Sequence, residues 1–194
     1  MSDKFQNKYR ITSTRLQNWD YSWNAAYFIT ICTQNREHYF GEIENNKMVL
    51  SKQGILADVL WYEIQHHAKN IDLDEFVVMP NHIHGILILN GNGGNDHNDD
   101  DIVETRHALS LTIGQKRFQN QGKNSVSSII GSYKSAVTKH ANRLRLKFVW
   151  QTRFHEHIIR NSVEHKRIKN YIANNPTKWK EDKFYKYHTD YTNI

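Results

Sequence analysis

The sequence predicts an α+β fold, in which helices pack on a central, mainly antiparallel sheet. Stretches rich in aromatic and β-branched residues interleave with stretches whose apolar residues recur at helical spacing. The two most apolar stretches are separated only by Pro80 and Asn81, and so short a link joins antiparallel strands. With 194 residues, of which 38% are hydrophobic, the chain is long enough for one domain with a core of its own.

The first half of the chain is expected to contain four strand segments and one helix before the histidine-bearing strand. Residues 25–33 form a strand, and residues 39–43 and 48–50 flank Asn45 and Asn46 as a hairpin. Residues 55–66 have the spacing of an amphipathic helix, whose core-facing positions are Ile55, Leu56, Val59, Leu60 and Ile64. The strand at residues 76–79 turns at Pro80 into residues 82–89, which are apolar on both faces and therefore belong in the centre of the sheet.

Residues 90–124 break this pattern and divide the predicted domain. They are rich in Asn and Gly, then acidic, and too polar to fold alone, so we expect a flexible insertion. The sequence thus predicts a single domain formed by residues 25–89 and 125–180. Residues 1–24 form an N-terminal extension, and residues 181–194 form a C-terminal tail.

Two helices and a strand are expected in the second half. Ser127 or Ser128 caps a helix that runs to about Leu144, and a strand follows at residues 154–160. Asn161 then begins another helix, with Glu164 at the spacing of a capping box. This helix must end at or just before Pro176, because proline cannot continue it.

The charge of the chain favours an anionic partner. The net charge is +6, and residues 125–188 carry 14 Lys and Arg against four Asp and Glu. Such a surface is typical of nucleic-acid binding, and a merely solvated basic face is the alternative. One cysteine allows no internal disulfide, and neither a signal peptide nor a long apolar run is present, so we expect a cytoplasmic protein with no membrane partner.

The chemically most informative residues are His82 and His84. Residues two apart on a strand point to the same face, so the two imidazoles converge while Ile83 faces the core. Such a pair can hold a divalent metal that acts on phosphate, or the residues are simply hydrogen-bonded core histidines. A second pair, His155 and His157, encloses Glu156, whose carboxylate is unsuited to a core; we interpret this pair as structural or DNA-facing.

Tyr171 is the candidate nucleophile. It lies one turn before Asn175 on the same helix face, and the Asn175 amide oxygen can serve as a third metal ligand. A phenol, whose pKa is ordinarily about 10, is a poor nucleophile unaided. A metal that polarises the phosphate reduces the basicity that the nucleophile needs. An ordinary half-buried aromatic residue is the alternative. Tyr133, beside Lys134, is the rival nucleophile, although it has no neighbouring ligand residue.

Cations and aromatic residues near this helix are candidate DNA contacts. The candidate phosphate-binding residues are Lys134, Arg153, Arg160, Lys166, Arg167, Lys169 and Lys178. Trp150, Phe154, Trp179 and Tyr185 can stack on unpaired bases, with core packing as the alternative for each.

These motifs, taken together, resemble the single-tyrosine HUH transposases, and among them the REP-associated tyrosine transposases of bacteria. "HUH" denotes two histidines around a bulky apolar residue, here His82-Ile83-His84. The resemblance covers most of residues 10–180 except the insertion. Its matching segments are residues 20–22, 26–36, 40–43, 74–85, 131–139, 150–151, 156–161 and 171–176.

The resemblance implies a ferredoxin-like HUH endonuclease fold and Mg²⁺- or Mn²⁺-dependent cleavage of single-stranded DNA. In this analogy His82, His84 and Asn175 hold the metal, and Tyr171 attacks phosphorus to give a 5′-phosphotyrosine and a free 3′-hydroxyl. That hydroxyl later rejoins strands, so no nucleotide cofactor is required. The substrates implied are palindromic hairpins, handled by a nucleoid-associated monomer or homodimer.

Two other functions are compatible with these motifs. One is an HUH nickase of the replication-initiator or relaxase type, whose helicase or long accessory domains are not expected within 194 residues. The other is a non-catalytic DNA-binding protein that retains the fold. The combination of His82, His84, Tyr171 and Asn175 argues against a pure binding role, which needs no such set.

Overall fold

A four-stranded antiparallel sheet forms the centre of the molecule. The structure, a computed structural model, describes residues 19, 21, 23–90 and 125–185. The strands, in the order β4-β5-β1-β6, are β4 (Ile71–Met79), β5 (His82–Leu89), β1 (Ala25–Thr33) and β6 (Trp150–Ile159). The first strand lies between the third and the fourth along the chain, which confirms the ferredoxin-like α+β fold.

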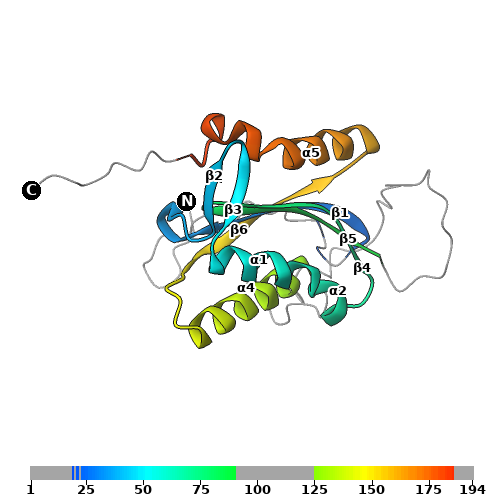
Figure 1. Cartoon of the computed structure of the whole chain (residues 1–194). Coiled ribbons are helices and arrows are strands. Elements are labelled where there is room, and N and C mark those ends of the chain that lie inside the picture. Colours follow the sequence, from blue (N-terminus) through cyan, green and yellow to red (C-terminus); the bar gives the residue numbers. More distant parts are fainter. Residues whose placement is uncertain (1–18, 20, 22, 91–124, 186–194) are drawn as a thin grey trace, which may run out of the picture.

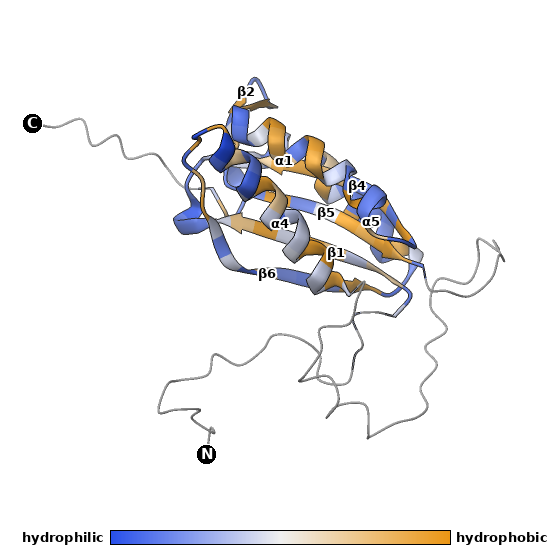
Figure 2. Ribbon diagram, turned by 90° about the horizontal axis from the view of Figure 1, so that it is seen from below, coloured by the Kyte–Doolittle hydropathy of each residue, from blue (hydrophilic) through white to orange (hydrophobic). Residues whose placement is uncertain are grey.

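Helices cover both faces of the sheet (Figure 1). The helices on one face are α1 (Lys52–Tyr62), α2 (Ile64–His67) and α4 (Val126–Arg143), whereas α5 (Ser162–Asn174) lies on the other. A small hairpin of β2 (Gly41–Glu44) and β3 (Lys47–Leu50) turns at Asn45 and Asn46, as predicted, with both residues in the left-handed region. Viewed from the side of α1 and α4, the inner strands are largely apolar and the edge strand β6 is mostly hydrophilic (Figure 2).

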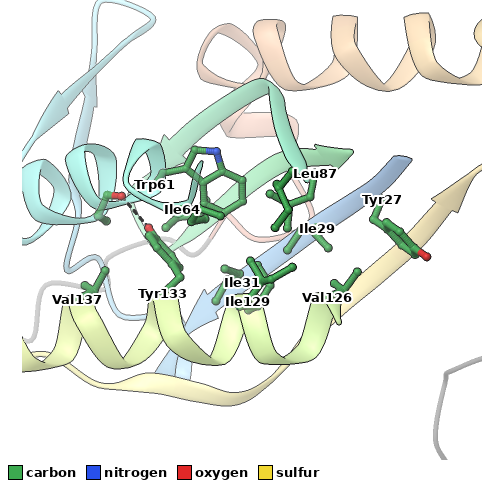
Figure 3. Close-up of a cluster of buried hydrophobic side chains, with 14 of the residues drawn as sticks. Tyr27, Ile29, Ile31, Trp61, Ile64, Leu87, Val126, Ile129, Tyr133 and Val137 are labelled. Atoms are coloured by element: carbon green, nitrogen blue, oxygen red, sulfur yellow. Dashed lines mark hydrogen bonds between the residues drawn. The ribbon is translucent and has the colours of Figure 1, made fainter. Parts of the chain in front are cut away.

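The main core lies between the sheet and the α1–α4 layer. Figure 3 shows Trp61 of α1 and Tyr133 of α4 pointing toward each other above Ile29 and Ile31 of β1. The Trp61 ring stacks on Phe76, with 4.6 Å between ring centroids. A smaller cluster on the opposite face packs Ile168 and Ile172 of α5 against the sheet residues Ala26, Ile86 and Ile159. Alternation along β5 therefore sends Ile83 and Leu87 into the main core and leaves His82 and His84 on the α5 face.

Gly85→Ala is expected to destabilise the protein by about 1–3 kcal/mol. A Cβ at this position would overlap the indole of Trp61, which Phe76 and Tyr133 hold in place. Urea denaturation of the two proteins measures the difference. Gly131→Ala is the control, because a Cβ there meets no atom within 4 Å among the described residues, and it should be neutral or stabilising.

The helix predicted at residues 55–66 is rotated and broken in the structure. Ser51 caps α1 through Gly54 N–H, the helix ends at Tyr62, and the short α2 follows Glu63. Ile55 and Val59 are 51% and 54% exposed, so the predicted core-facing positions were wrong for these two residues. Ile64 is buried as predicted, and Ala57 and Trp61 supply the rest of the buried face. The bulky indole decides the rotation, since it occupies the space above Gly85.

The other predicted elements differ only at their ends. Ser125 caps α4, rather than Ser127 or Ser128, and its hydroxyl accepts a hydrogen bond from Ser128 N–H. Strand β6 begins at Trp150, four residues before the predicted start. Asn161 caps α5 through Glu164 N–H, as predicted, and α5 ends before Pro176.

Parts of the predicted domain plan lie outside the described residues. These parts are most of the N-terminal extension, residues 91–124 of the insertion and residues 186–194 of the tail. Among the residues that are described, no helix is long and apolar enough to span a membrane.

Candidate active site

Two strand-borne imidazoles form the floor of the candidate site. His82 and His84 are 0% and 1% exposed, and their ring centroids are 4.5 Å apart. Strand β5 is an inner strand, so β4 and β1 hold it on both sides and the two rings have little freedom to separate. The convergence predicted from the two-residue spacing is therefore present on the face covered by α5.

Asn81 orients the ring of His82. The Asn81 amide nitrogen donates to two backbone carbonyls, those of Phe184 at 2.8 Å and Arg36 at 3.3 Å. Its oxygen must then face His82 Nδ1, at 2.9 Å, and Nδ1 must carry the proton. His82 Nε2 is left with its lone pair, and it has no hydrogen-bond partner among the described residues.

His84 is held in a similar way from the neighbouring strand. Its Nδ1 lies 2.9 Å from Thr30 Oγ1 on β1, and its Nε2 faces the hydroxyl of Tyr171. Burial lowers the pKa of His84 to about 3 and lowers the pKa of His82 well below its usual value. Both rings are therefore neutral at pH 7, which is the form that binds a metal.

Acidification is expected to destabilise the metal-free protein. An unfolded histidine takes up its proton near pH 6.5, whereas folded His84 does so only near pH 3. Between these values the unfolded chain binds more protons, so the free energy of unfolding falls as the pH falls. At pH 5 this contribution from His84 is about 2 kcal/mol. Urea denaturation in EDTA at pH 7.5 and pH 5 measures the change in the free energy of unfolding.

The matched variant for this measurement is His84→Asn, which cannot titrate. Between pH 7.5 and pH 5, its free energy of unfolding should fall by about 2 kcal/mol less than that of the wild-type protein. Equal losses in the two proteins would contradict the low pKa of His84.

The end of α5 brings Tyr171 to these histidines. The Tyr171 hydroxyl lies 3.3 Å from His84 Nε2 and donates to Asp182 Oδ2 at 3.2 Å. Asn175, one turn later and buried, donates its amide N–H to the same Asp182 oxygen at 3.2 Å. Burial, with the Asp182 charge next in importance, raises the pKa of Tyr171 to about 12. The hydroxyl is thus positioned at the site and fully protonated at neutral pH.

The residues gathered here fit a hard divalent cation. His82, His84 and Asp182 each offer a ligand atom, and these atoms all lie within 4.8 Å of one another. The Asn175 amide oxygen is buried and lacks a hydrogen-bond partner among the described residues, as His82 Nε2 does. Two imidazoles combined with carboxylate and amide oxygens form a donor set that suits Mn²⁺ or Mg²⁺.

Asp182 is the site residue that sequence reasoning missed. It lies just after the short helix η2 (Pro176–Glu181), in the segment interpreted as a C-terminal tail. Its Oδ1 accepts from Phe184 N–H at 2.7 Å, and the Phe184 ring packs against His82. The only available signal was an acidic residue in a strongly basic stretch, which does not indicate where the chain folds back.

Tyr133 lies on the other side of the sheet. Its ring is buried in the α1–α4 layer, and its hydroxyl donates to the Ala57 carbonyl at 2.7 Å (Figure 3). Burial raises its pKa well above the usual value. The structure therefore brings Tyr171, and not the rival Tyr133, to the two histidines.

The candidate DNA contacts are in several different environments. Arg167 and Lys178 line a cleft of about 360 Å³ that also contains Tyr171. Lys169 instead pairs with Asp74 on β4, which ties α5 to the sheet edge. The exposed cations on β6 and around the start of α5 are Arg153, Arg160 and Lys166.

Lys134 and Trp150 belong to the opposite layer. The Lys134 ammonium donates to the backbone carbonyl of Gln151 at 2.6 Å. The Trp150 indole N–H donates to the Lys134 carbonyl at 3.1 Å, and its ring packs against the main core. For Trp150 the structure shows core packing, the alternative considered above, along one side of the ring.

The second histidine pair lies on β6, the edge strand. His157 contacts Glu164 at the start of α5, with Nε2 and Oε1 2.9 Å apart. His155 pairs in register with Thr30, on the row of the sheet that contains His84. This arrangement agrees with the interpretation that the pair is structural or DNA-facing.

Comparison with known proteins gives one close relative and a fold match. No protein-family model matches the chain. An uncharacterized protein of Haemophilus influenzae is 34% identical over 175 residues, which are 89% of this chain and 92% of that protein. The structure of a REP-associated tyrosine transposase bound to a REP hairpin is 20% identical, with a TM-score of 0.52, and the match covers 89% of this chain and 73% of the other. The chain therefore belongs to one family with the Haemophilus influenzae protein and has the fold of the REP-associated tyrosine transposases.

Proposed function

We propose that this protein is a metal-dependent endonuclease and strand transferase that cleaves single-stranded DNA through a covalent bond to Tyr171. One observation carries the proposal: the Tyr171 hydroxyl lies 3.3 Å from His84 Nε2, beside two converging neutral imidazoles and Asp182. A tyrosine that only packs in a core does not need two neutral imidazoles and a carboxylate around its hydroxyl. The fold match to a transposase whose structure contains a DNA hairpin supports the same class of reaction.

The candidate metal ligands are His82, His84, Asp182 and Asn175. A divalent ion bound there would polarise the scissile phosphate as a Lewis acid. The protein's own contribution is to hold these four donors in place before substrate arrives. Asn81 and Thr30 fix the two rings, and the Phe184 backbone N–H holds the Asp182 carboxylate.

Tyr171 forms the new bond in the proposed reaction. Its oxygen attacks phosphorus, the bond between phosphorus and the 3′-oxygen breaks, and that oxygen leaves as a 3′-hydroxyl after taking up a proton. Asp182 Oδ2 already accepts the phenol hydrogen bond and is placed to take the phenol proton. The reverse attack by a 3′-hydroxyl on the phosphotyrosine releases Tyr171 and rejoins a strand.

The surface around Tyr171 suits a polyanion. Arg167 and Lys178 line the same cleft and can bind phosphates on either side of the scissile one. Arg153, Arg160 and Lys166 extend the positive charge over β6 and the start of α5. We propose hairpin-forming repeats as the substrate, with Mn²⁺ or Mg²⁺ as the metal, in a monomer or homodimer.

A denaturing gel tests the proposal. A single-stranded hairpin oligonucleotide with unpaired flanks, labelled at either end, is incubated with the protein and Mn²⁺. The 3′-labelled fragment should shift to the mass of a protein adduct, while the 5′-labelled fragment runs free with a 3′-hydroxyl. EDTA should abolish both products. Tight DNA binding without any adduct in Mn²⁺ or Mg²⁺ would leave a non-catalytic binding protein as the function.

A further inference from the structure

A second cleft, of about 430 Å³, includes Arg36 in its lining. It lies between the short helix η1 (Gln34–Arg36), directly after β1, and the start of β6. Its lining residues are Gln34, Asn35, Arg36, Val149, Trp150, Gln151 and Thr152. Two segments that the proposed chemistry leaves unused, residues 34–36 and 150–151, therefore meet in space although more than a hundred residues separate them. The volume falls within the range of small-ligand sites.

The backbone at this cleft is irregular. The pairing of β1 with β6 shifts register between Ile31 and Thr33, and Gln34 N–H bonds to the Val149 carbonyl at 2.9 Å. Asn35 and Arg36 both have left-handed backbones, with φ of 54° and 62°. Successive left-handed residues without glycine cost conformational energy, and such strain clusters at functional sites. The shift and the turn lie at the cleft, where Thr33 still pairs with Trp150.

The lining of the cleft suits the edge of a nucleobase. Gln34, Asn35 and Gln151 carry side-chain amides, each of which can donate and accept a hydrogen bond at once. Paired donor and acceptor groups are what base edges present, and Asn and Gln bind them bidentately. Trp150 also lines the cleft, and its indole N–H bond to the Lys134 carbonyl holds its ring against the main core. The lining includes the Arg36 cation and no carboxylate, so it does not repel DNA.

Arg36 connects this cleft to the candidate active site. Its guanidinium lies 4.0 Å from the centroid of the Phe184 ring and contacts Cys32 Sγ. Cys32 is the register partner of His82, and the Arg36 carbonyl accepts from Asn81. One residue of the cleft lining, Arg36, thus contacts both Asn81, which orients His82, and Phe184, whose ring packs on His82.

We propose that this cleft binds an unpaired nucleobase next to the cleavage position and reads its polar edge with the amides of Gln34 and Gln151. The inference rests on the proposed function, since a DNA strand at Tyr171 is what brings the base to the cleft. It adds a sequence preference that the metal site alone does not provide. The preferred base is the one whose strand the wild-type protein binds most tightly in the experiment below.

Binding to base-bearing and abasic strands tests the assignment. The probes are fluorescent single strands of about 12 nucleotides with A, C or T bases, and an abasic strand with the same backbone. Anisotropy in EDTA measures binding without cleavage. Gln34→Ala combined with Gln151→Ala should weaken binding of the preferred base strand about tenfold and reduce the differences among bases. Its affinity for the abasic strand should not change.

Two further variants sharpen the test. Asn35→Gly keeps the left-handed backbone while removing the third amide. It should weaken binding of the preferred base strand, by a smaller factor than the double variant does. Gln65→Ala removes an exposed amide on α2, on the other face of the sheet, and should change nothing.

The possible outcomes separate this inference from the proposed function. An equal loss for base-bearing and abasic strands, or no loss at all, would overturn base reading even if the wild-type protein forms the covalent adduct. Failure of the wild-type protein to bind any of the strands would overturn base reading, whereas the adduct on the hairpin substrate tests the proposed function separately. Loss of adduct formation in the amide variants without a change in base preference would also contradict the inference.

Discussion

Tyr171→Phe is expected to lower covalent adduct formation and cleavage by about 10⁴-fold or more, while DNA binding remains nearly unchanged. The substitution removes only the oxygen that forms the bond to phosphorus. The ring itself keeps its contacts, an edge-on packing against Phe28 with centroids 6.1 Å apart and a tilted packing against His84 at 5.3 Å. The lost hydrogen bond to Asp182 is partly solvent-exposed, so the effect on stability should be small.

Tyr133→Phe is the matched control for this prediction. It removes the hydrogen bond to the buried Ala57 carbonyl and should reduce the free energy of unfolding by about 1–2 kcal/mol. Adduct formation by the folded protein should persist, because the ring lies on the opposite face of the sheet from His82 and His84. A denaturing gel and a urea titration on the same preparations measure both effects. An adduct that survives in Tyr171→Phe and disappears in Tyr133→Phe would show that the nucleophile assignment is wrong.

His82→Ala is expected to weaken Mn²⁺ binding at least about 100-fold and to abolish cleavage. The reason is geometric: its Nε2 is buried, unpaired among the described residues and already deprotonated, because Asn81 keeps the proton on Nδ1. Calorimetric titration with Mn²⁺ measures binding without reference to activity. His66→Ala, on the exposed surface of α2, is the control and should leave the affinity unchanged. Unchanged Mn²⁺ affinity in His82→Ala would exclude the proposed metal site.

Two milder variants distinguish the contributions of the two oxygen ligands to Mn²⁺ binding. Asp182→Asn keeps an oxygen but removes the charge, whereas Asn175→Ala removes the amide oxygen. We expect the larger loss of Mn²⁺ affinity for Asp182→Asn, since a carboxylate binds a hard cation more strongly than an amide does. The reverse order would make Asn175, rather than Asp182, the stronger of the two oxygen ligands.

Local patterns in the chain were sufficient for the framework of the fold. Strand pairing across Pro80 and Asn81, the Asn161 cap and the end of α5 before Pro176 all follow from residues within a few positions of one another. The same is true of the shared face of His82 and His84, and of the single turn between Tyr171 and Asn175. Periodicity of two or 3.6 residues is an intrinsic property of a strand or a helix, so it can be recognised without knowing the neighbours.

Tertiary packing decided the features that join distant segments. The rotation of α1 depends on the fit of Trp61 above Gly85, which no helical periodicity encodes. The place of Asp182 depends on the fold of η2 and on the Phe184 backbone, which returns to Asn81 across about a hundred residues. The sequence alone therefore determined the α+β class and where the two histidines and Tyr171 lie on their own elements. Only the folded chain decided which tyrosine meets the histidines, which carboxylate joins them and that Gln34 and Gln151 line one cleft. The reason is that long-range contacts depend on side-chain volume and chain closure rather than on local repeats.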